Sequence, residues 1–595
     1  MDFIKKNPAL VAVVTVAVLM LLPFLGLADF NTKGEPREAV VALSMLKEGN
    51  WILPVNNGGD IPYKPPFFHF CIALLSLLSG SVSEYTSRLP SALALVAMTT
   101  GCFAFFKRRK SATVALVAAV LTLTSFEVHR AGTNCRVDMM LTAFTVGALL
   151  LLYRWWERGA KGLPVCAVLC MSGAVLTKGP VGAVVPCFVM GVFMLLRGVK
   201  LWHTIWRMAL LGVLSLLLPA VWYVAAWHEG GQHFLDLVYE ENIGRMTGSM
   251  TYESHEHGFG YNFFTLIVGW APWTLLTLFS LFSLRKKRLT AAAEQSAGGK
   301  LSLKDRACRF MKWLATMKPV ELFTWLSFLL VLFFYCLPSS KRSVYLLPCY
   351  PFMAVLIAEY VDWLWRTRRC APLRVFTVMM AVLSVVLTAV FGAVRLGAVP
   401  DSIFHGKHAA ENIAMLHALR FTPLNVWTLL LVALPAVNAI DVLRMTLAKS
   451  WQNYSRRMYY YLLSPVVLLF IALDGVYQPL VLNTKSLRPM AAYIAHTFPG
   501  EPLYSYINAP MMHFFGADFY LGDTIGQFEN GSQGAAGLRD TAATPEHGVL
   551  IIPEGDFPDF QRRHADYRFS LVSTSKGRIS EVKDNVSFYR FRRVK

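Results

Sequence analysis

Residues 29–38 read Asp29-Phe30-Asn31-Thr32-Lys33-Gly34-Glu35-Pro36-Arg37-Glu38, and the hydrophilic stretch that they begin ends at Tyr63-Lys64-Pro65-Pro66. Acidic and basic side chains stand side by side here, directly after an apolar run from Pro8 to Ala28. That run is too long for the apolar core of a signal peptide and no small-residue cleavage site precedes the polar stretch, so we interpret it as an uncleaved first membrane span. We expect residues 29–66 to hold part of an active site that faces away from the cytoplasm.

The composition indicates a polytopic membrane protein. The chain has 595 residues, 55% of them hydrophobic, and a mean hydropathy of +0.45. Its net charge of +20 is better explained by Lys and Arg kept in cytoplasmic loops than by nucleic-acid binding. The ten cysteines are scattered and form no CxxC pair, which argues against a disulfide framework or a zinc site.

Many further apolar runs have the length of membrane spans. The strongest lie at 89–106, 111–126, 138–153, 163–177, 181–196, 208–227, 263–284, 320–337, 344–365, 373–396, 424–443 and 461–478. The segment 67–80 is also apolar, but as a helix it would be about 21 Å long, short of a hydrocarbon core of about 30 Å. We therefore predict about thirteen spans, with 67–80 as a re-entrant or interfacial helix.

The loops between these runs predict their orientation. Basic clusters fall in every second loop, which places those loops in the cytoplasm by the positive-inside rule. They lie at 107–110, 154–161, 197–207, 285–288, 366–374 and 444–457. The N-terminus is then cytoplasmic, and the external loops are 29–66, 81–88, 127–137, the turn at Lys178, 228–262, 338–343 and 397–422. We interpret the basic loop 285–319 as a topology determinant without chemistry.

Residues 479–595 differ from the rest of the chain. They contain β-prone runs at 502–506 and 548–552 and a helical stretch from Leu487 to Thr497. Alternating strands and helices predict a small external α/β domain, separate from a membrane domain of residues 1–478. Because it has no glycine-rich phosphate loop, we expect it to handle an acceptor or to act as a cap.

A set of charged side chains lies at the external ends of the spans. It comprises Glu35, Arg37, Lys64, Arg88, Arg130, Asp138, Lys178, Arg245, His255, His257, Lys341 and Arg342. A single Arg at such a place more often extends to lipid headgroups than binds a substrate. The whole set, arriving at one face from separate loops, instead indicates a site for an anionic substrate such as a phosphate.

Two lysines precede prolines in a way that fixes their position. The residue before a proline is excluded from the helical region, so Lys64 should be extended, and Pro66 can begin the helix 67–80. This arrangement would hold Lys64 at a helix N-terminus, where an anion is also favoured. Lys178-Gly179-Pro180 repeats the pattern, although a simple tight turn explains it equally well.

At these residues the sequence resembles the lipid A aminoarabinose transferases, which are related to the protein O-mannosyltransferases. The resemblance covers about residues 8 to 360 and rests on an ordered series of short motifs. They are 35–39 (EPREA), 49–54 (GNWILP), 63–66 (YKPP), 87–90 (SRLP), 130–138, 176–180 (LTKGP), 241–245 (ENIGR), 270–273 (WAPW), 340–342 (SKR) and 345–348 (YLLP).

The resemblance implies a GT-C glycosyltransferase fold in the bacterial inner membrane. Such an enzyme moves a sugar from undecaprenyl phosphate to an external acceptor, here 4-amino-4-deoxy-L-arabinose to lipid A, a lipopolysaccharide modification tied to polymyxin resistance. It also implies roles for site residues. The catalytic set is Glu35, Asp138 and Lys64, and the substrate-binding set is Arg37, Tyr63, Arg88, Lys178, Arg245, His255, Lys341, Arg342 and Tyr345.

Three departures from the family pattern affect the chemistry. Gly34 stands where relatives have a second acid, Glu38 where they have a tyrosine, and Tyr63 where they have a glutamate. Fixed cations, Lys64 and Arg37 first, would stabilise the leaving phosphate. A phosphate acceptor needs no general base, which the loss of an acid at 34 favours, whereas a hydroxyl acceptor needs one, and Glu35 is our assignment.

The sequence also allows other functions. A transporter or flippase of lipid-linked sugars also has many spans and internal charges, but such proteins usually show an internal repeat, and none is visible. A related GT-C enzyme that glycosylates protein or another glycan, or an assembly factor acting through the C-terminal domain, are further alternatives. A divalent metal could be shared by Glu35, Asp138 and one of His255 and His257, although no spacing demands one.

Overall fold

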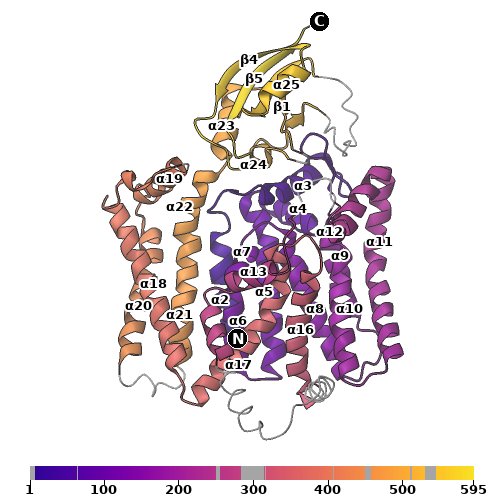
Figure 1. Ribbon diagram of the computed structural model, residues 1–595, viewed down its shortest axis with the longest axis vertical. Coiled ribbons are helices and arrows are strands. Elements are labelled where there is room, and N and C mark those ends of the chain that lie inside the picture. Colours follow the sequence, from indigo (N-terminus) through magenta and orange to yellow (C-terminus); the bar gives the residue numbers. More distant parts are fainter. Residues whose placement is uncertain are drawn as a thin grey trace.

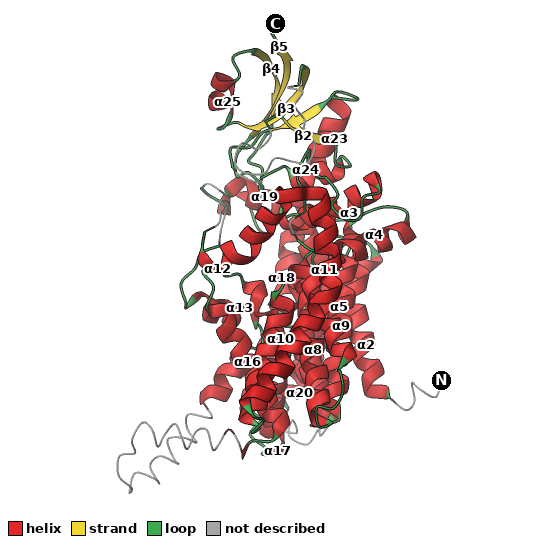
Figure 2. Cartoon of the chain, turned by 90° about the vertical axis from the view of Figure 1, so that its right-hand side faces the viewer, coloured by secondary structure: helices red, strands yellow, loops and turns green. Residues whose placement is uncertain are grey.

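The computed structural model describes residues 7–62, 64–249, 255–282, 314, 316–406, 408–448, 457–509, 512–529 and 545–594. Helices stand side by side in a bundle, and a small sheet caps one end of it (Figure 1). A quarter turn shows the same division, with the strands all at one end (Figure 2). The basic cluster 285–288, most of the loop 285–319 and Tyr63 lie outside the described residues.

The described helices confirm a multi-pass membrane protein. Eight are long and apolar enough to cross a membrane, or ten if each of two bent pairs is one span. The long helices include α5 (Glu84–Lys107), α8 (Val137–Glu157), α11 (Leu201–Tyr239), α16 (Pro319–Cys336), α17 (Tyr350–Arg366), α18 (Ala371–Arg395), α20 (Val426–Leu447) and α21 (Arg457–Ala472). Shorter apolar helices are α2 (Pro8–Leu21), α4 (Phe67–Ser79), α9 (Val165–Lys178) and α10 (Val181–Leu196). Since thirteen spans would require counting three of these short helices, that number remains a prediction.

Two of the predicted spans are bent. Residues 111–126 continue from α6 (Ala112–Leu123) into α7 (Phe126–Gly132) through a bend of 69°. Residues 263–284 form α13 (Tyr261–Gly269) and a second helix, Thr274–Phe282, at 113°. Pro272 lies at the second bend and cannot donate a helical hydrogen bond. A hydrogen bond joins the two bends: the Phe126 amide donates to the Ala271 carbonyl at 2.9 Å.

The predicted external loop 228–262 is partly helical. Helix α11 extends to Tyr239, with a break at Gly231, whose φ of 56° and ψ of −144° are not helical. A π-helical turn, η2 (Glu240–Gly244), and the short α12 (Arg245–Thr247) follow it. Arg245 is thereby carried on an ordered turn.

The hydrophilic stretch after the first span is more ordered than a loop. Helix α3 (Gly34–Glu48) begins with Pro36 and Glu35 in its first turn and ends at Gly49, which is left-handed with φ 72°. Helix α4 begins after Pro65-Pro66, as predicted, and its 13 residues make it about 20 Å long. Figure 1 shows α3 and α4 at the end of the bundle that carries the sheet.

The C-terminal residues form the predicted mixture of strands and helices. The elements are α23 (Arg488–Thr497), β1 (Leu503–Ser505), α24 (Phe515–Tyr520), β2 (Ile525–Gln527), β3 (His547–Pro553), α25 (Phe557–Arg563), β4 (Tyr567–Thr574) and β5 (Val586–Arg593). The strand order is β2-β1-β3-β5-β4, with β1 parallel to β2 and β3 and with β5 antiparallel to β3 and β4. Alternate residues of β3 enter opposite cores: Val549 and Ile551 pack with α23, and Leu550 and Ile552 with α25.

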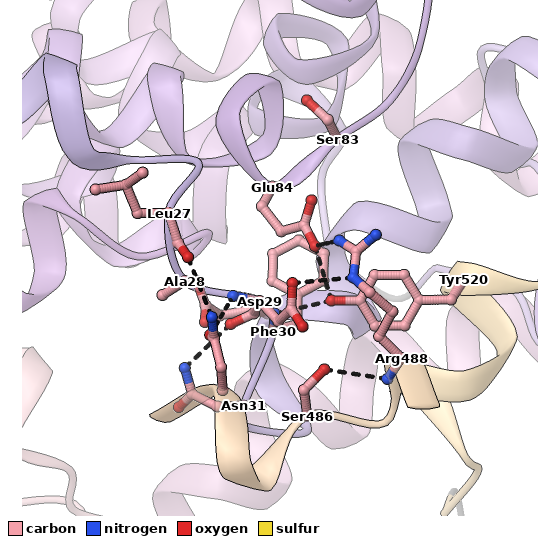
Figure 3. A network of polar contacts seen from close by, with 12 residues as sticks. Leu27, Ala28, Asp29, Phe30, Asn31, Ser83, Glu84, Ser486, Arg488 and Tyr520 are labelled. Atoms are coloured by element: carbon pink, nitrogen blue, oxygen red, sulfur yellow. Dashed lines mark hydrogen bonds and ion pairs between the residues drawn. The ribbon is translucent and has the colours of Figure 1, made fainter. Parts of the chain in front are cut away.

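The sheet domain is tied to the bundle by a network around Arg488 (Figure 3). Arg488 Nε donates to Asp29 Oδ1 at 2.9 Å, and its guanidinium forms an ion pair with Glu84. Tyr520 donates its hydroxyl proton to Glu84 at 2.8 Å and accepts from the Phe30 amide at 3.0 Å. The start of the hydrophilic stretch is therefore held between α5 and the C-terminal domain.

A second group of contacts fixes the remainder of that stretch. Ser44 donates to Asp523 Oδ2 at 2.6 Å, and Lys47 donates to the Asp523 carbonyl at 2.7 Å. Gln527 Nε2 donates to the Asn57 carbonyl at 3.0 Å. The C-terminal domain thus rests directly on α3 and on the loop that follows it.

Candidate active site

A cavity of about 430 Å³ opens where the hydrophilic stretch, two later loops and the C-terminal domain meet. The charged side chains that line it are Lys33, Arg37, Glu38, Asp60, Lys64, Arg245, Arg342, Glu581 and Lys583. Six of these are cations and three are acids, so the cavity favours an anionic ligand. Four of the cations that the sequence singled out, Arg37, Lys64, Arg245 and Arg342, come together here from three separate segments.

Glu38 is the centre of the polar contacts on the bundle side of the cavity. It lies on α3, forms an ion pair with Lys64, and contacts His69 Nε2 at 3.0 Å and Arg37 Nη2 at 3.5 Å. Although burial opposes the effect, Lys64, His69 and Arg37 hold the pKa of Glu38 well below its usual range. Glu38 is therefore a carboxylate at neutral pH.

Lys64 lies at the entrance to α4, two residues before its N-cap Pro66. His69 follows in the first turns of the same helix and is 1% exposed. Burial lowers the pKa of Lys64 to about 8, although the ion pair with Glu38 opposes this. At neutral pH Lys64 is still a cation, but it can lose its proton at a modestly higher pH.

Glu35 and Arg88, both assigned to the site from the sequence, are bound to each other instead. Arg88 donates to the two Glu35 oxygens at 2.8 and 3.1 Å, and its other N–H groups go to the carbonyls of Leu25, Ala28 and Asp29. Glu35 is 1% exposed and Arg88 3%. Since every guanidinium proton is used, neither side chain can bind a substrate without breaking this network, and neither is among the described residues that line the cavity.

Asp138 and Lys178 form an ion pair behind the cavity wall. The Lys178 ammonium lies 4.4 Å from the centre of the Tyr345 ring, and the Tyr345 hydroxyl accepts from Arg245 Nη1 at 3.4 Å. Arg245 in turn binds both oxygens of Glu241 at 2.7 Å. A continuous chain of contacts therefore connects Asp138 to Arg245 at the cavity.

The predicted pair Lys341 and Arg342 divides into two roles. Lys341 is 4% exposed and donates to the carbonyls of His257 at 2.9 Å and Pro338 at 2.6 Å, so it holds its own turn together. Arg342 lines the cavity and contacts His255 Nε2. His257 stacks on Tyr261 instead, with ring centres 3.9 Å apart, so His255 is the histidine nearer the cavity.

Some residues of the cavity were not predicted from the sequence. Glu38 was noted only as a departure, His69 is a single histidine in an apolar run, and Glu581 comes from the C-terminal domain. Arg136, which is not among the described lining residues, packs against Gly34: a β-carbon at 34 would lie 2.1 Å from Arg136 Nη2. An acid at this position would therefore require the Arg136 guanidinium to move.

The structure does not gather a metal site in its described part. There, no group of three or more His, Cys, Asp and Glu side chains lies close enough to hold an ion. The trio that could have shared a metal is bound to other partners instead: Glu35 binds Arg88, Asp138 binds Lys178 and His255 contacts Arg342.

A second cavity is apolar and lies between helices of the bundle. It has a volume of about 550 Å³ and is lined by side chains of α4, α5 and α8, among them Leu75, Leu93, Met98, Met140 and Phe144. Helix α4 begins at the polar cavity and also lines this one. A ligand with a charged head and a hydrocarbon chain would fit, with its head in the polar cavity and its chain in the apolar one.

Comparisons with known proteins agree with this architecture. Residues 63–223 match the family described as dolichyl-phosphate-mannose-protein mannosyltransferase. An uncharacterized protein of Aquifex aeolicus is 28% identical over 357 residues, 58% of this chain and 64% of that protein. The undecaprenyl phosphate-alpha-4-amino-4-deoxy-L-arabinose arabinosyl transferases of Enterobacter sp. and Shewanella sediminis are 24% and 25% identical, covering 61% and 60% of this chain. The chain matches 60% of the length of each of these two relatives.

The crystal structure of ArnT from Cupriavidus metallidurans bound to undecaprenyl phosphate superposes with a TM-score of 0.67 over 98% of both chains, at 17% identity. A likeness at this identity concerns the fold. The chain therefore has the GT-C fold of ArnT, and in sequence it resembles the aminoarabinose transferases that are related to the protein mannosyltransferases.

Proposed function

We propose that the protein is a membrane glycosyltransferase that moves a sugar from an undecaprenyl-phosphate donor to a lipid or glycan acceptor. The observation that carries this proposal is the cavity at Glu38, where Arg37, Lys64, Arg245 and Arg342 converge on one space beside a carboxylate. Such a site suits the transfer of a sugar between phosphate-bearing lipids. By analogy with the named relatives, the sugar is 4-amino-4-deoxy-L-arabinose and the acceptor is lipid A.

The proposed reaction breaks the bond between the sugar C1 and the carrier phosphate oxygen and forms a bond from C1 to an acceptor oxygen. The carrier phosphate leaves with an additional negative charge. Lys64 and Arg37 would stabilise that charge, with Arg342 and Arg245 in support, because preorganised cations in a partly buried cavity act strongly. Asp138 would position Lys178 and, through Tyr345, the wall of the site.

The carboxylate that serves the reaction is Glu38 in this proposal, in place of Glu35. If the acceptor is a phosphate, Glu38 holds Lys64 in position and no base is needed. If it is a hydroxyl, Glu38 takes its proton, with His69 as the hydrogen-bonded neighbour. The apolar cavity beside α4 would take part of the polyprenyl chain.

We further propose that residues 1–478 form the catalytic membrane unit and that residues 479–595 form a periplasmic domain. This orientation follows from the basic loops, with the N-terminus in the cytoplasm of a bacterium and the active site on the outer side of its inner membrane. Accessibility of engineered cysteines at residues 47 and 576 to a membrane-impermeant reagent in whole cells would test it.

The experiment that tests the proposed function uses the purified full-length protein in detergent. It is incubated with undecaprenyl phosphate-aminoarabinose and lipid A, and the products are identified by mass. A lipid A product that carries the added sugar supports the proposal and names the sugar and the acceptor. If no transfer occurs, but the lipid-linked sugar crosses the membrane of vesicles that contain the protein, the protein is a transporter and the proposal is wrong.

A further inference from the structure

One wall of the polar cavity is built by a single turn of the C-terminal domain, residues 579–584. The Ile579 amide donates to the Asp584 carbonyl at 2.7 Å, and the Lys583 amide donates to the Ile579 carbonyl at 2.7 Å. Lys583 is left-handed with a φ of 57°, a conformation that side-chain-bearing residues adopt at a cost. The tip of the turn, Glu581 to Lys583, lines the cavity.

The turn is firmly anchored, so its position is set by the domain. Ile579 and Val582 pack against the core formed by Leu487, Ile494 and Phe588. Arg578 Nη2 also donates to the Lys583 carbonyl at 2.6 Å. Glu581 lies between Ile579 and Val582 in the sequence and is held at the cavity lining by the same turn.

Glu581 has an unused hydrogen-bonding atom. Its Oε1 accepts from the Gly516 amide at 3.1 Å, whereas Oε2 is buried and has no hydrogen-bond partner among the described residues. Burial raises the pKa of this carboxyl to about 8, so it is mostly protonated at neutral pH. A hydrogen-bond donor placed on Oε2 favours the ionised form, in which that oxygen accepts. An acid that serves only to hold the turn would be expected to have both oxygens bonded, because an unmade buried hydrogen bond costs about 1–3 kcal/mol.

The two walls of the cavity both carry charge, but the bundle side holds most of the cations. They come from α3, the α4 entrance, α12 and the turn before η3 (Ser343–Cys349), beside Glu38 and Asp60, and the C-terminal domain adds the Glu581 carboxyl next to Lys583. A ligand that matches both walls carries a phosphate at one point and a hydrogen-bond donor at another. A sugar joined to a phosphate has this chemistry, through its hydroxyl or amino groups.

We propose that Glu581 is a substrate-binding residue, which accepts a hydrogen bond from a hydroxyl or amino group of a phosphate-linked sugar held by Arg37, Lys64 and Arg342. The inference rests on the proposed function for the identity of its ligand. Both the donor and the acceptor of that reaction contain such a sugar, so the experiment must separate them. In either case the C-terminal domain takes part in recognition.

The test compares the affinities of three lipids for the full-length protein by native mass spectrometry. They are undecaprenyl phosphate, undecaprenyl phosphate-aminoarabinose and lipid A. Glu581→Gln should weaken one of the two sugar-bearing lipids about tenfold and leave undecaprenyl phosphate unchanged. Whichever lipid is weakened identifies the substrate that Glu581 contacts. Glu554→Gln, an exposed glutamate of the same domain, is the matched control and should change none of the three.

The result that overturns the inference is an unchanged affinity for both sugar-bearing lipids, or an equal loss for all three. If Glu581→Gln does not fold, Glu581→Asp keeps the carboxyl but shortens its reach, and it should show the same selective loss. Failure of the proposed function looks different, because the wild-type protein would then bind none of these lipids or transfer no sugar.

Discussion

Glu35 and Glu38 lie about one turn apart on α3 and have opposite surroundings. Glu35 accepts hydrogen bonds from Nε and Nη2 of Arg88 and from the Cys135 amide. The remaining N–H groups of Arg88 donate to backbone carbonyls. Glu38 contacts Lys64, His69 and Arg37, and all four line the polar cavity. The difference shows that burial and an ion pair do not by themselves identify a functional acid. What separates the two is whether the partners of the acid still face an open space.

The strongest test of this contrast removes Arg88. Arg88→Met leaves the Glu35 carboxylate buried without its counterion, which typically costs about 3–5 kcal/mol. We expect a large fall in the thermal unfolding midpoint in detergent. Adding Glu35→Gln should recover part of the loss, since the uncompensated charge is then gone.

The same variants can also contradict the assignment. If Glu35→Gln abolished sugar transfer while leaving the unfolding midpoint and the donor affinity unchanged, Glu35 and not Glu38 would be the reacting acid. The comparison of the two acids would then have to be reversed.

For the partner of Glu38, Lys64→Ala should lower the transfer activity and leave the stability of the fold unchanged. Removing one charge-stabilising group from such a site costs about 10²–10³ in rate, and Lys64 is only partly buried. We expect that loss in the transfer rate with an unfolding midpoint close to that of the wild type. Lys161→Ala, at an exposed lysine outside the cavity lining, is the control. A wild-type rate for Lys64→Ala would remove Lys64 from the site.

The sequence pattern singled out the cations of the polar cavity more readily than its acid. Lys64, Arg37, Arg245 and Arg342 were found because charges at span ends are rare and have few other uses. Glu35 was chosen over Glu38 because the family resemblance places the acid just before Arg37, and nothing local distinguishes two acids in one helical turn. The partner that decides the matter, Arg88, is 53 residues away, and its saturation depends on three carbonyls of another segment.

The fold shows the same limit. Hydropathy predicted most of the apolar helices to within a few residues, although α11 extends well beyond the predicted run 208–227. The β-prone runs predicted β1 and β3 of the C-terminal domain but not β2, β4 or β5. The successes depend on local composition and periodicity. Hydropathy did not predict the bends at 124–125 and 270–273. Those are fixed by contacts between distant segments, such as the hydrogen bond from the Trp273 indole to the Thr124 hydroxyl at 3.0 Å.

The pH dependence of transfer sharpens the role of Lys64. Burial lowers its pKa to about 8, with Glu38 and Asp138 raising it and Arg37 lowering it further. We expect the rate to fall as pH rises through about 8, reaching roughly a tenfold loss one unit above. Lys64→Arg, whose guanidinium keeps its proton, should move this fall to higher pH.

Unfolding does not explain that fall. A folded-state pKa below the unfolded one means that the unfolded chain binds more protons between about pH 8 and the ordinary lysine pKa, so this group adds stability as pH rises there. A rate that stayed constant up to pH 10 in folded protein would show that the Lys64 charge is not needed.

The smallest expected effect concerns the contact of the C-terminal domain at Arg488. This side chain is 51% exposed, so its ion pairs with Asp29 and Glu84 are screened, and Arg488→Ala should reduce stability by no more than about 1 kcal/mol. It also releases Asp29, which precedes α3, and so loosens the segment that leads to both acids. We expect this loosening to displace the cavity residues of α3 without breaking the Glu35–Arg88 pair. The transfer rate should then fall several-fold while the unfolding midpoint changes little. Arg562→Ala, an exposed arginine of α25 paired only within its own helix among the described contacts, should change neither quantity. An equal loss from both variants would mean that the domain contact does not position the site.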